Sequence, residues 1–194
     1  MKIKYYAIIL CCLTLSACHT PPERQNFSEI SFKHLPPFTF NVAEIEIADG
    51  YKPLQNYPYV DHLFRNIPKQ SMIQWAKDRL KAGGNMGFLR YTILEASIKQ
   101  VPLKMQGGIK GLLTTEQSDR YDIILKIQID VENNNGLQKG QITAEATRSQ
   151  TVPENATLNQ REKIWYQLTE QALQELNTQT ENNIRQYLQK FLMQ

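Results

Sequence analysis

The chain contains very little cysteine, and none of it lies in the body of the sequence. Its three cysteines are Cys11, Cys12 and Cys18, so no cysteine follows residue 18. A disulfide framework, a thiol nucleophile and a cysteine metal site are therefore excluded for the remaining residues. The fold has to be stable without covalent bridges.

Histidine is also scarce, which limits catalytic and metal chemistry. The three histidines are His19, His34 and His62, and no His-x-x-x-His spacing is present. A hydrolase needs a nucleophile and an orienting group around its histidine, yet no nucleophile-elbow motif surrounds Ser71. We therefore predict a non-enzymatic protein without catalytic residues, cofactor or metal. A periplasmic enzyme that uses His62 is the less favoured alternative.

No apolar run is long enough to span a bilayer. The run from Tyr5 to Leu15 follows Lys2 and Lys4 and covers 11 residues, whereas a spanning helix needs about 20. A short positive region followed by a short apolar region is typical of a signal peptide. The run ends in Leu15, Ser16, Ala17 and Cys18.

These four residues resemble the lipobox of bacterial lipoproteins. The resemblance implies cleavage between Ala17 and Cys18 and attachment of diacylglycerol to the Cys18 thiol. Residue 19 is His, whereas an Asp there retains such lipoproteins in the inner membrane. We expect a lipid anchor on the periplasmic face of the outer membrane, with the inner membrane as the alternative. An ordinary signal peptide with a chance cysteine is the other interpretation of the motif.

Neither sign of charge dominates after the signal peptide. Without Lys2 and Lys4, 20 basic residues stand against 19 acidic ones. Nucleic-acid binding depends on clustered Lys and Arg, and the sequence has no such cluster. We expect no nucleic-acid partner.

Domain boundaries follow from composition. We predict a lipoprotein signal peptide over residues 1–17, a lipidated tether over 18–36 and a single α/β domain over 37–194. The tether is expected because the stretch after Cys18 is polar and contains proline. The remaining length suits one well-buried domain.

Alternation of apolar and polar residues predicts strands over 38–49, 88–99, 120–132 and 137–152, the last two joined by an Asn-Asn-Asn-Gly turn. A helical period predicts a helix over 68–84, ended by Gly83 and Gly84, and a second helix from Thr157 that projects or bends near residue 178. The predicted fold class is α+β, a two-layer sandwich of about four mainly antiparallel strands with two helices on one face. The predicted order is β-α-β-β-β-α.

Two segments are candidate partner-binding surfaces. One is a long loop over 50–67 that carries Tyr57 and Tyr59, and the other, rich in glycine, carries Ile109, Leu112 and Leu113. Long loops and exposed apolar side chains are often functional. The alternative is that these side chains cover the domain's own core.

The order of elements resembles that of small α/β lipoproteins that assist envelope transport. Examples are the lipoprotein of the lipopolysaccharide-translocation complex, whose Gly-Cys-Gly start is absent here, and auxiliary lipoproteins of lipid-trafficking ABC systems. The segments WAKDRLKAGG, EQSDRYD and TVPENATLNQREKIWY are similar to a proteobacterial lipoprotein family of unknown function. The resemblance implies a binding or assembly subunit with an envelope protein partner, in lipid or lipopolysaccharide transport. The alternative is a structural lipoprotein that links the membrane to the cell wall.

Overall fold

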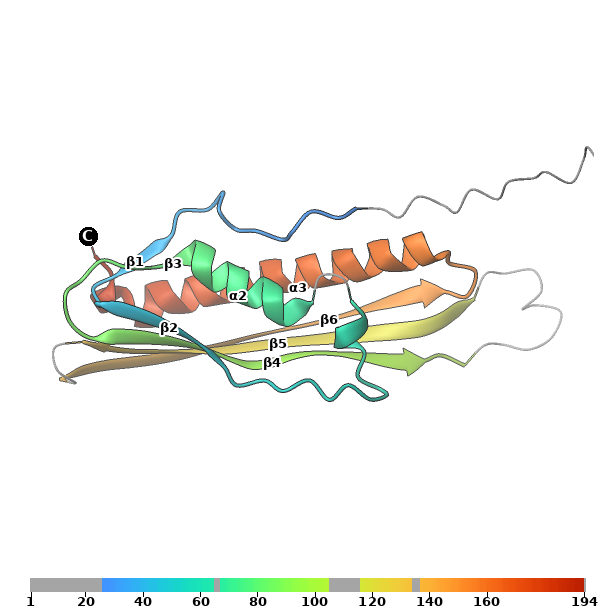
Figure 1. The fold of residues 1–194 in the computed structure, drawn as a ribbon, viewed down its shortest axis with the longest axis horizontal. Coiled ribbons are helices and arrows are strands. Elements are labelled where there is room, and N and C mark those ends of the chain that lie inside the picture. The colour runs from blue at the N-terminus through green and yellow to red at the C-terminus, as the bar shows by residue number, and fades with distance from the viewer. Residues whose placement is uncertain (1–25, 65–66, 105–115, 134–136, 194) are drawn as a thin grey trace, which may run out of the picture.

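The computed structural model describes residues 26–64, 67–104, 116–133 and 137–193. They form two layers, a long twisted sheet and a layer of two helices that covers one of its faces (Figure 1). The helices are α2 (Pro68–Arg79) and α3 (Leu158–Tyr187). The predicted α+β two-layer sandwich is confirmed.

The main sheet has four strands in the order β2-β4-β5-β6. They are β2 (Glu44–Asp49), β4 (Phe88–Pro102), β5 (Gln117–Asn133) and β6 (Gln138–Pro153). β2 pairs with β4 in parallel and the other neighbours are antiparallel. A parallel pair requires a crossover, and α2 lies within it.

The first predicted strand, over 38–49, is in fact two strands. β1 (Phe38–Phe40) pairs in parallel with β3 (Leu80–Ala82) in a separate small sheet, and the chain then crosses to β2. Val42 lies in this crossing and is fully buried, whereas Glu44 is exposed. Val42 therefore does not share a strand face with Glu44, as the alternation alone had indicated.

The helix predicted over 68–84 ends earlier, at Arg79. Leu80 is its C-cap in extended conformation, so Gly83 and Gly84 are not the caps. Their small size serves close approach instead, because a Cβ on Gly84 would lie 2.6 Å from the carbonyl carbon of Asn41. Gly84 lets the chain after β3 pass directly against the crossing from β1 to β2, whereas a Cβ on Gly83 would meet the side chains of Met193 and Thr39.

The core lies between the sheet and the helices. All six alternating residues of β5 expected in the core are at most 3% exposed; they are Tyr121, Ile123, Leu125, Ile127, Ile129 and Val131. From β6, Ile142, Ala144 and Ala146 also face inward, as predicted. The Asn-Asn-Asn-Gly turn lies largely outside the described residues, although β5 and β6 do form an antiparallel pair.

α3 is one continuous helix through residue 178. It begins with the predicted capping box, in which Thr157 Oγ1 accepts from the Gln160 N–H and Gln160 Oε1 accepts from the Thr157 N–H. Its 30 residues give a length of about 45 Å. The 17-residue β5 reaches about 56 Å. The expected bend or projection is wrong because the sheet is long enough to support the whole helix.

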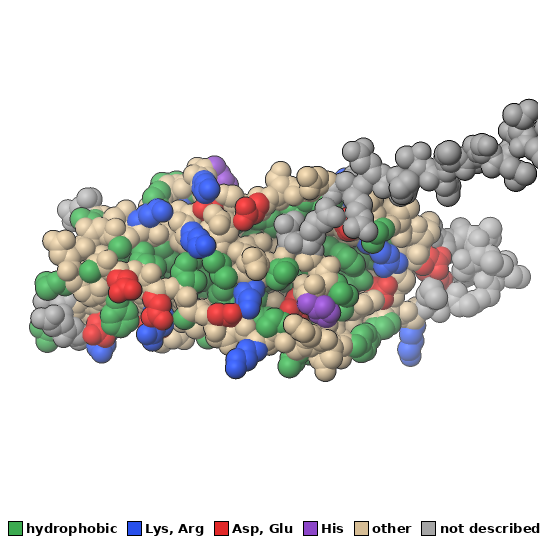
Figure 2. All heavy atoms as spheres, in the orientation of Figure 1, with side chains coloured by type: hydrophobic (Ala, Val, Ile, Leu, Met, Phe, Trp, Pro, Cys, Tyr) green, Lys and Arg blue, Asp and Glu red, His purple; other side chains and the backbone are tan. Residues whose placement is uncertain are grey.

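The outer face of the sheet is charged and solvated. Ion pairs cross it from strand to strand, Arg90 with Glu46 at 2.8 Å and Lys126 with Glu145 at 2.9 Å. Figure 2, which views the two layers from the side, shows basic, acidic and apolar side chains interspersed over the visible surface. This arrangement fits the nearly balanced charge of the chain after residue 17.

Candidate functional site

The N-terminal described segment lies across the helical layer (Figure 1). We call residues 26–37 the strap. Ile30 and Phe32 are 5% and 4% exposed and belong to the core, and Phe27 stacks on Tyr166 of α3 with ring centroids 4.9 Å apart. The tether predicted over 18–36 is therefore corrected for residues 26–36, which are bound to the domain because their apolar side chains are buried.

A buried carboxylate on α2 fixes the strap. Asp78 is 7% exposed, and its Oδ2 accepts from the Phe32 N–H at 2.8 Å and from the Ser31 hydroxyl at 2.9 Å. Gln74 Nε2 donates to the other oxygen at 2.8 Å. A buried carboxylate is stable only when its oxygens are paired, and here the strap supplies two of the three donors.

A buried arginine holds the far end of the strap. Arg79 is 1% exposed, and its guanidinium donates to the Pro36 carbonyl and to Glu181 of α3, the latter at 2.9 Å. Burial lowers the pKa of Arg79, and the carboxylate of Glu181 opposes that shift. One cation therefore ties the strap, α2 and α3 together.

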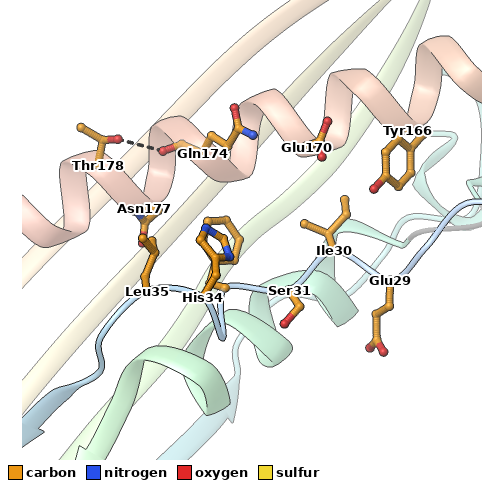
Figure 3. A pocket seen from close by; sticks show the side chains of 11 residues that line it. Glu29, Ile30, Ser31, His34, Leu35, Tyr166, Glu170, Gln174, Asn177 and Thr178 are labelled. Carbon is orange, nitrogen blue, oxygen red and sulfur yellow. Dashed lines mark hydrogen bonds between the residues drawn. The ribbon is translucent and has the colours of Figure 1, made fainter.

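A groove of about 420 Å³ lies between the strap and α3 (Figure 3). We call it the strap groove. Ile30, Phe32 and Leu35 line it from the strap, and a row of α3 side chains at helical spacing lines the other side: Tyr166, Glu170, Gln174, Asn177 and Thr178. The groove therefore combines an apolar wall with a polar one.

The polar wall is held in place by a contact with α2. Asn177 is 8% exposed, and its Oδ1 accepts from the Trp75 indole N–H at 2.9 Å, which fixes the amide at the groove. Burial, and then the nearby charge of Glu170, raise the pKa of Tyr166, so its phenol stays neutral at physiological pH. Such a wall suits hydrogen bonding to a ligand that also carries apolar surface.

Glu170 and Glu29 give the groove a negative rim. Both line it, and neither forms an ion pair within the described part of the chain. His34 also lines the groove and stacks on Phe32 with ring centroids 6.2 Å apart. The arrangement favours a ligand group that donates hydrogen bonds or carries positive charge.

Of the predicted contact residues, the structure describes Tyr57 and Tyr59, and neither lines this groove. Tyr57 is 66% exposed, whereas Tyr59 is half-buried, forms a bridge with Lys99 of β4 and has the Lys99 Nζ 5.2 Å from its ring centroid. Tyr59 thus covers the edge of β4, and Tyr57 remains available to a partner. Ile109, Leu112 and Leu113, together with Ala17 and Cys18, lie outside the described residues.

In the described structure, the candidate catalytic histidine is not hydrogen-bonded to a nucleophile or to an orienting group. His62 is exposed in a short 3-10 helix, whereas Ser71 is 6% exposed within α2, and no hydrogen bond joins them. Its neighbour Asp61 is 2% exposed and has one oxygen without a hydrogen-bond partner. Within the described ranges, no three His, Cys, Asp or Glu side chains gather closely enough to hold a metal ion.

Sequence reasoning missed both the strap and the groove. A usable signal was present, because Phe27, Ile30, Phe32 and Leu35 are too apolar for a solvated linker. Their partners are far away in the sequence: Asp78 of α2 lies 46 positions after Phe32, and Tyr166 of α3 stacks on Phe27. Nothing in the local pattern identifies those partners.

None of the described helices is both long and apolar enough to cross a bilayer.

No protein-family model matches the chain. It is 27% identical over 119 residues to a UPF0182 protein found in two strains of Mycobacterium leprae. The match covers 61% of this chain but only 11% of those relatives, so the chain spans about a tenth of their length.

Among solved structures, the chain is similar to two lipoproteins and a DUF330 protein. A minor lipoprotein from Acinetobacter baumannii aligns with 81% of this chain and 99% of its own, at 14% identity and a TM-score of 0.39. Rare lipoprotein B from Shewanella oneidensis covers 73% of this chain and 98% of its own, at 15% identity and a TM-score of 0.28. A DUF330 protein from Xanthomonas campestris covers 83% and 98%, at 6% identity and a TM-score of 0.29.

Proposed function

We propose that this chain is a lipoprotein, anchored through Cys18 to the periplasmic face of the outer membrane, that acts by binding and not by catalysis. The lipobox-like sequence from Leu15 to Cys18, behind a signal-peptide pattern, supports the anchor. Several acyl chains on one terminus hold a protein firmly to a bilayer, whereas a single chain is marginal. The partner we propose is an envelope protein, in a lipid or lipopolysaccharide transport system.

The strap is the observation that carries this proposal. Because Phe27 stacks on Tyr166, the chain leaves the domain beside the first turns of α3. Only residues 19–25 separate the proposed anchor, Cys18, from the first described residue, Asn26, and the fully extended chain between the two spans about 28 Å. An anchor at Cys18 therefore keeps the N-terminal end of α3 close to the membrane surface.

The strap groove is the binding surface that we propose within the described structure. It lies along the same stretch of α3 and on the same face as the strap, with an apolar wall and an acidic rim. A partner segment with an apolar side chain beside a basic one fits this chemistry. Tyr57, Tyr59 and the segment with Ile109, Leu112 and Leu113 are proposed as further contacts.

The anchor is tested by metabolic labelling with a fatty acid in the bacterial envelope. Wild type should incorporate the label and Cys18→Ser should not. Cys12→Ser is the matched control, because Cys12 lies in the apolar run and should be removed with the signal peptide. Label on the Cys18→Ser chain, or a mature terminus elsewhere than Cys18, would contradict the proposal.

The groove is tested separately with a photo-crosslinking residue placed on α3. Gln174 lines the groove and Gln167 does not, although both are exposed glutamines of the same helix. A crosslinker at position 174 should capture an envelope protein far more efficiently than one at position 167. Equal capture would remove the groove from the proposal and leave the lipid anchor unaffected.

A further inference from the structure

The two edges of the main sheet differ in whether other parts of the chain cover their backbone groups. Where β4 extends past the end of β2, the loop after β2 covers its free edge. The Val60 N–H donates to the Ile98 carbonyl at 2.8 Å, and the Gln100 N–H donates to the Pro58 carbonyl at 2.9 Å. β6 forms the other edge, and no described strand pairs with its outer side. Exposed edges are usually covered or interrupted, so this difference calls for a physical reason.

β6 presents a regular row of backbone groups at this edge. Its register with β5 runs without a shift from Val152 to Gln138. The Thr143 carbonyl accepts from the Asn183 side chain of α3 at 2.8 Å, which places it on the side away from β5. Because backbone groups alternate along an antiparallel strand, those of Glu145, Thr147, Ser149 and Thr151 also face away from β5.

The charges near this edge are neutralised within the chain. Glu145 pairs with Lys126 of β5 at 2.9 Å, and Arg148 pairs with Glu175 of α3 at 2.7 Å. Charged side chains that point freely from an edge are a common barrier to strand pairing. Here both are already bound to internal partners, so that barrier is reduced.

The sequence of β6 is nearly symmetric about Thr147. When the strand is laid antiparallel on itself with Thr147 opposite Thr147, every opposed pair is compatible: Thr143 with Thr151, Glu145 with Ser149, Ile142 with Val152, Ala144 with Gln150, and Ala146 with Arg148. Thr meets Thr, apolar meets apolar, and each small alanine meets a long side chain. No like charges are opposed, and cross-strand pairs of these kinds stabilise sheets.

We propose that β6 pairs antiparallel with β6 of a second copy of this chain, about a two-fold axis at Thr147. The pairing joins two four-stranded sheets into one continuous eight-stranded sheet. A two-fold interface needs a self-complementary surface, and the symmetric pattern of β6 provides it. The Thr143 carbonyl then exchanges Asn183 for the N–H of Thr151 of the second copy.

Disulfide formation tests the register directly in the full chain within the native envelope. In a Thr147→Cys variant the two cysteines face each other with Cα atoms about 5.5 Å apart, within disulfide reach. In a Ser149→Cys variant they lie about 14 Å apart, because each is displaced by two residues along its strand. Thr147→Cys should yield the covalent dimer and Ser149→Cys should not, each compared with the parent chain, which retains Cys18.

Proline provides the second measurement, on the full chain purified in detergent. The Thr147 N–H faces away from β5, so Thr147→Pro removes an edge donor and leaves the pairing with β5 intact. Light scattering should give a dimeric protein mass for wild type and a monomeric one for Thr147→Pro, with circular dichroism spectra unchanged. A monomeric wild type, or equal crosslinking at positions 147 and 149, overturns the proposal. Crosslinking of Thr147→Cys to a different protein alone also overturns it, and none of these results depends on lipidation.

Discussion

Asp78 accepts a hydrogen bond from the backbone of Phe32, a residue 46 positions earlier, at 2.8 Å. The same carboxylate oxygen accepts from the Ser31 hydroxyl at 2.9 Å. This one side chain bonds the N-terminal segment directly to α2. The position of the strap groove depends on it as well, because Ser31 and Phe32 line the groove.

Asp78→Ala should release the strap from α2. The change leaves the buried Phe32 N–H and the Ser31 hydroxyl without an acceptor, at a cost of about 2–4 kcal/mol in the free energy of unfolding. Limited proteolysis should then cut within residues 26–36 long before the domain. Ser31→Ala is the milder control, because it removes one donor and leaves the Phe32 bond in place. A strap that resists protease in Asp78→Ala would show that Ile30 and Phe32 hold it unaided.

The same substitution on the two faces of β5 should destabilise the fold by very different amounts. Ile127 is fully buried, so Ile127→Asp places a carboxylate in the core without a partner and should cost several kcal/mol. Ile124 lies on the outer face and is only half-buried. Ile124→Asp should cost about 1 kcal/mol or less. Urea unfolding of both variants measures the difference, and equal costs would contradict the face assignment.

Asp119 should make the stability of the protein depend on pH in acid. Burial alone would raise its pKa, but hydrogen bonds from Gln100, Ser118 and Arg161, and the charge of Arg161, together lower it below the ordinary 3.8. A carboxylate with a lowered folded-state pKa stabilises the fold above its unfolded pKa, and the contribution is lost as pH falls through the folded value.

Asp119→Asn should therefore be less stable than wild type at pH 7, by about 1–2 kcal/mol. The difference should shrink as the pH falls below 3.8. Urea unfolding at a series of pH values measures both curves. Arg161→Met, which removes the cation 3.4 Å from Asp119, should reduce the same dependence. A difference that is constant with pH would mean that Asp119 acts only through its shape.

Replacing Ile109, Leu112 and Leu113 together with serine tests the glycine-rich segment as a contact site. If a partner covers these side chains, the melting temperature should hardly change while crosslinks to the partner in the envelope disappear. If they cover the domain's own core, each truncation should cost about 2–5 kcal/mol. A destabilised protein that keeps its crosslinks would remove this segment from the proposed function.

The architecture could be predicted from the sequence wherever one face of an element is buried along its whole length. The alternation of β5 identified all six of its core residues, and the capping box at Thr157 located the start of α3. The split between β1 and β2 could not be predicted, because Val42 continues the local alternation while its backbone changes sheets. Gly83 and Gly84 were misassigned because glycine ends helices and also permits close approach of chains.

The candidate groove could not be predicted because it is made by residues far apart in the sequence. Asn177 meets Trp75 across 102 positions, and Arg79 meets Glu181 across the same separation. Sequence patterns show which side chains are apolar and at what period they recur. They do not show that a stretch such as residues 26–36 lies against a particular pair of helices.

The topology of the sheet also sets an order of events during folding. β5 and β6 are joined through residues 134–137, so their long pairing closes a short loop, whereas β2 reaches β4 only after residues 50–87 have been organised. Local contacts form faster than distant ones, because less chain entropy is lost when they close. We expect the hairpin of β5 and β6 to be the first stable structure. Pulse-labelling hydrogen exchange should detect protection of the Ile127 amide before that of the Ile47 amide. The reverse order would contradict this expectation. The N-terminal strands, which leave the ribosome first, therefore have to wait for the C-terminal half before they gain a partner.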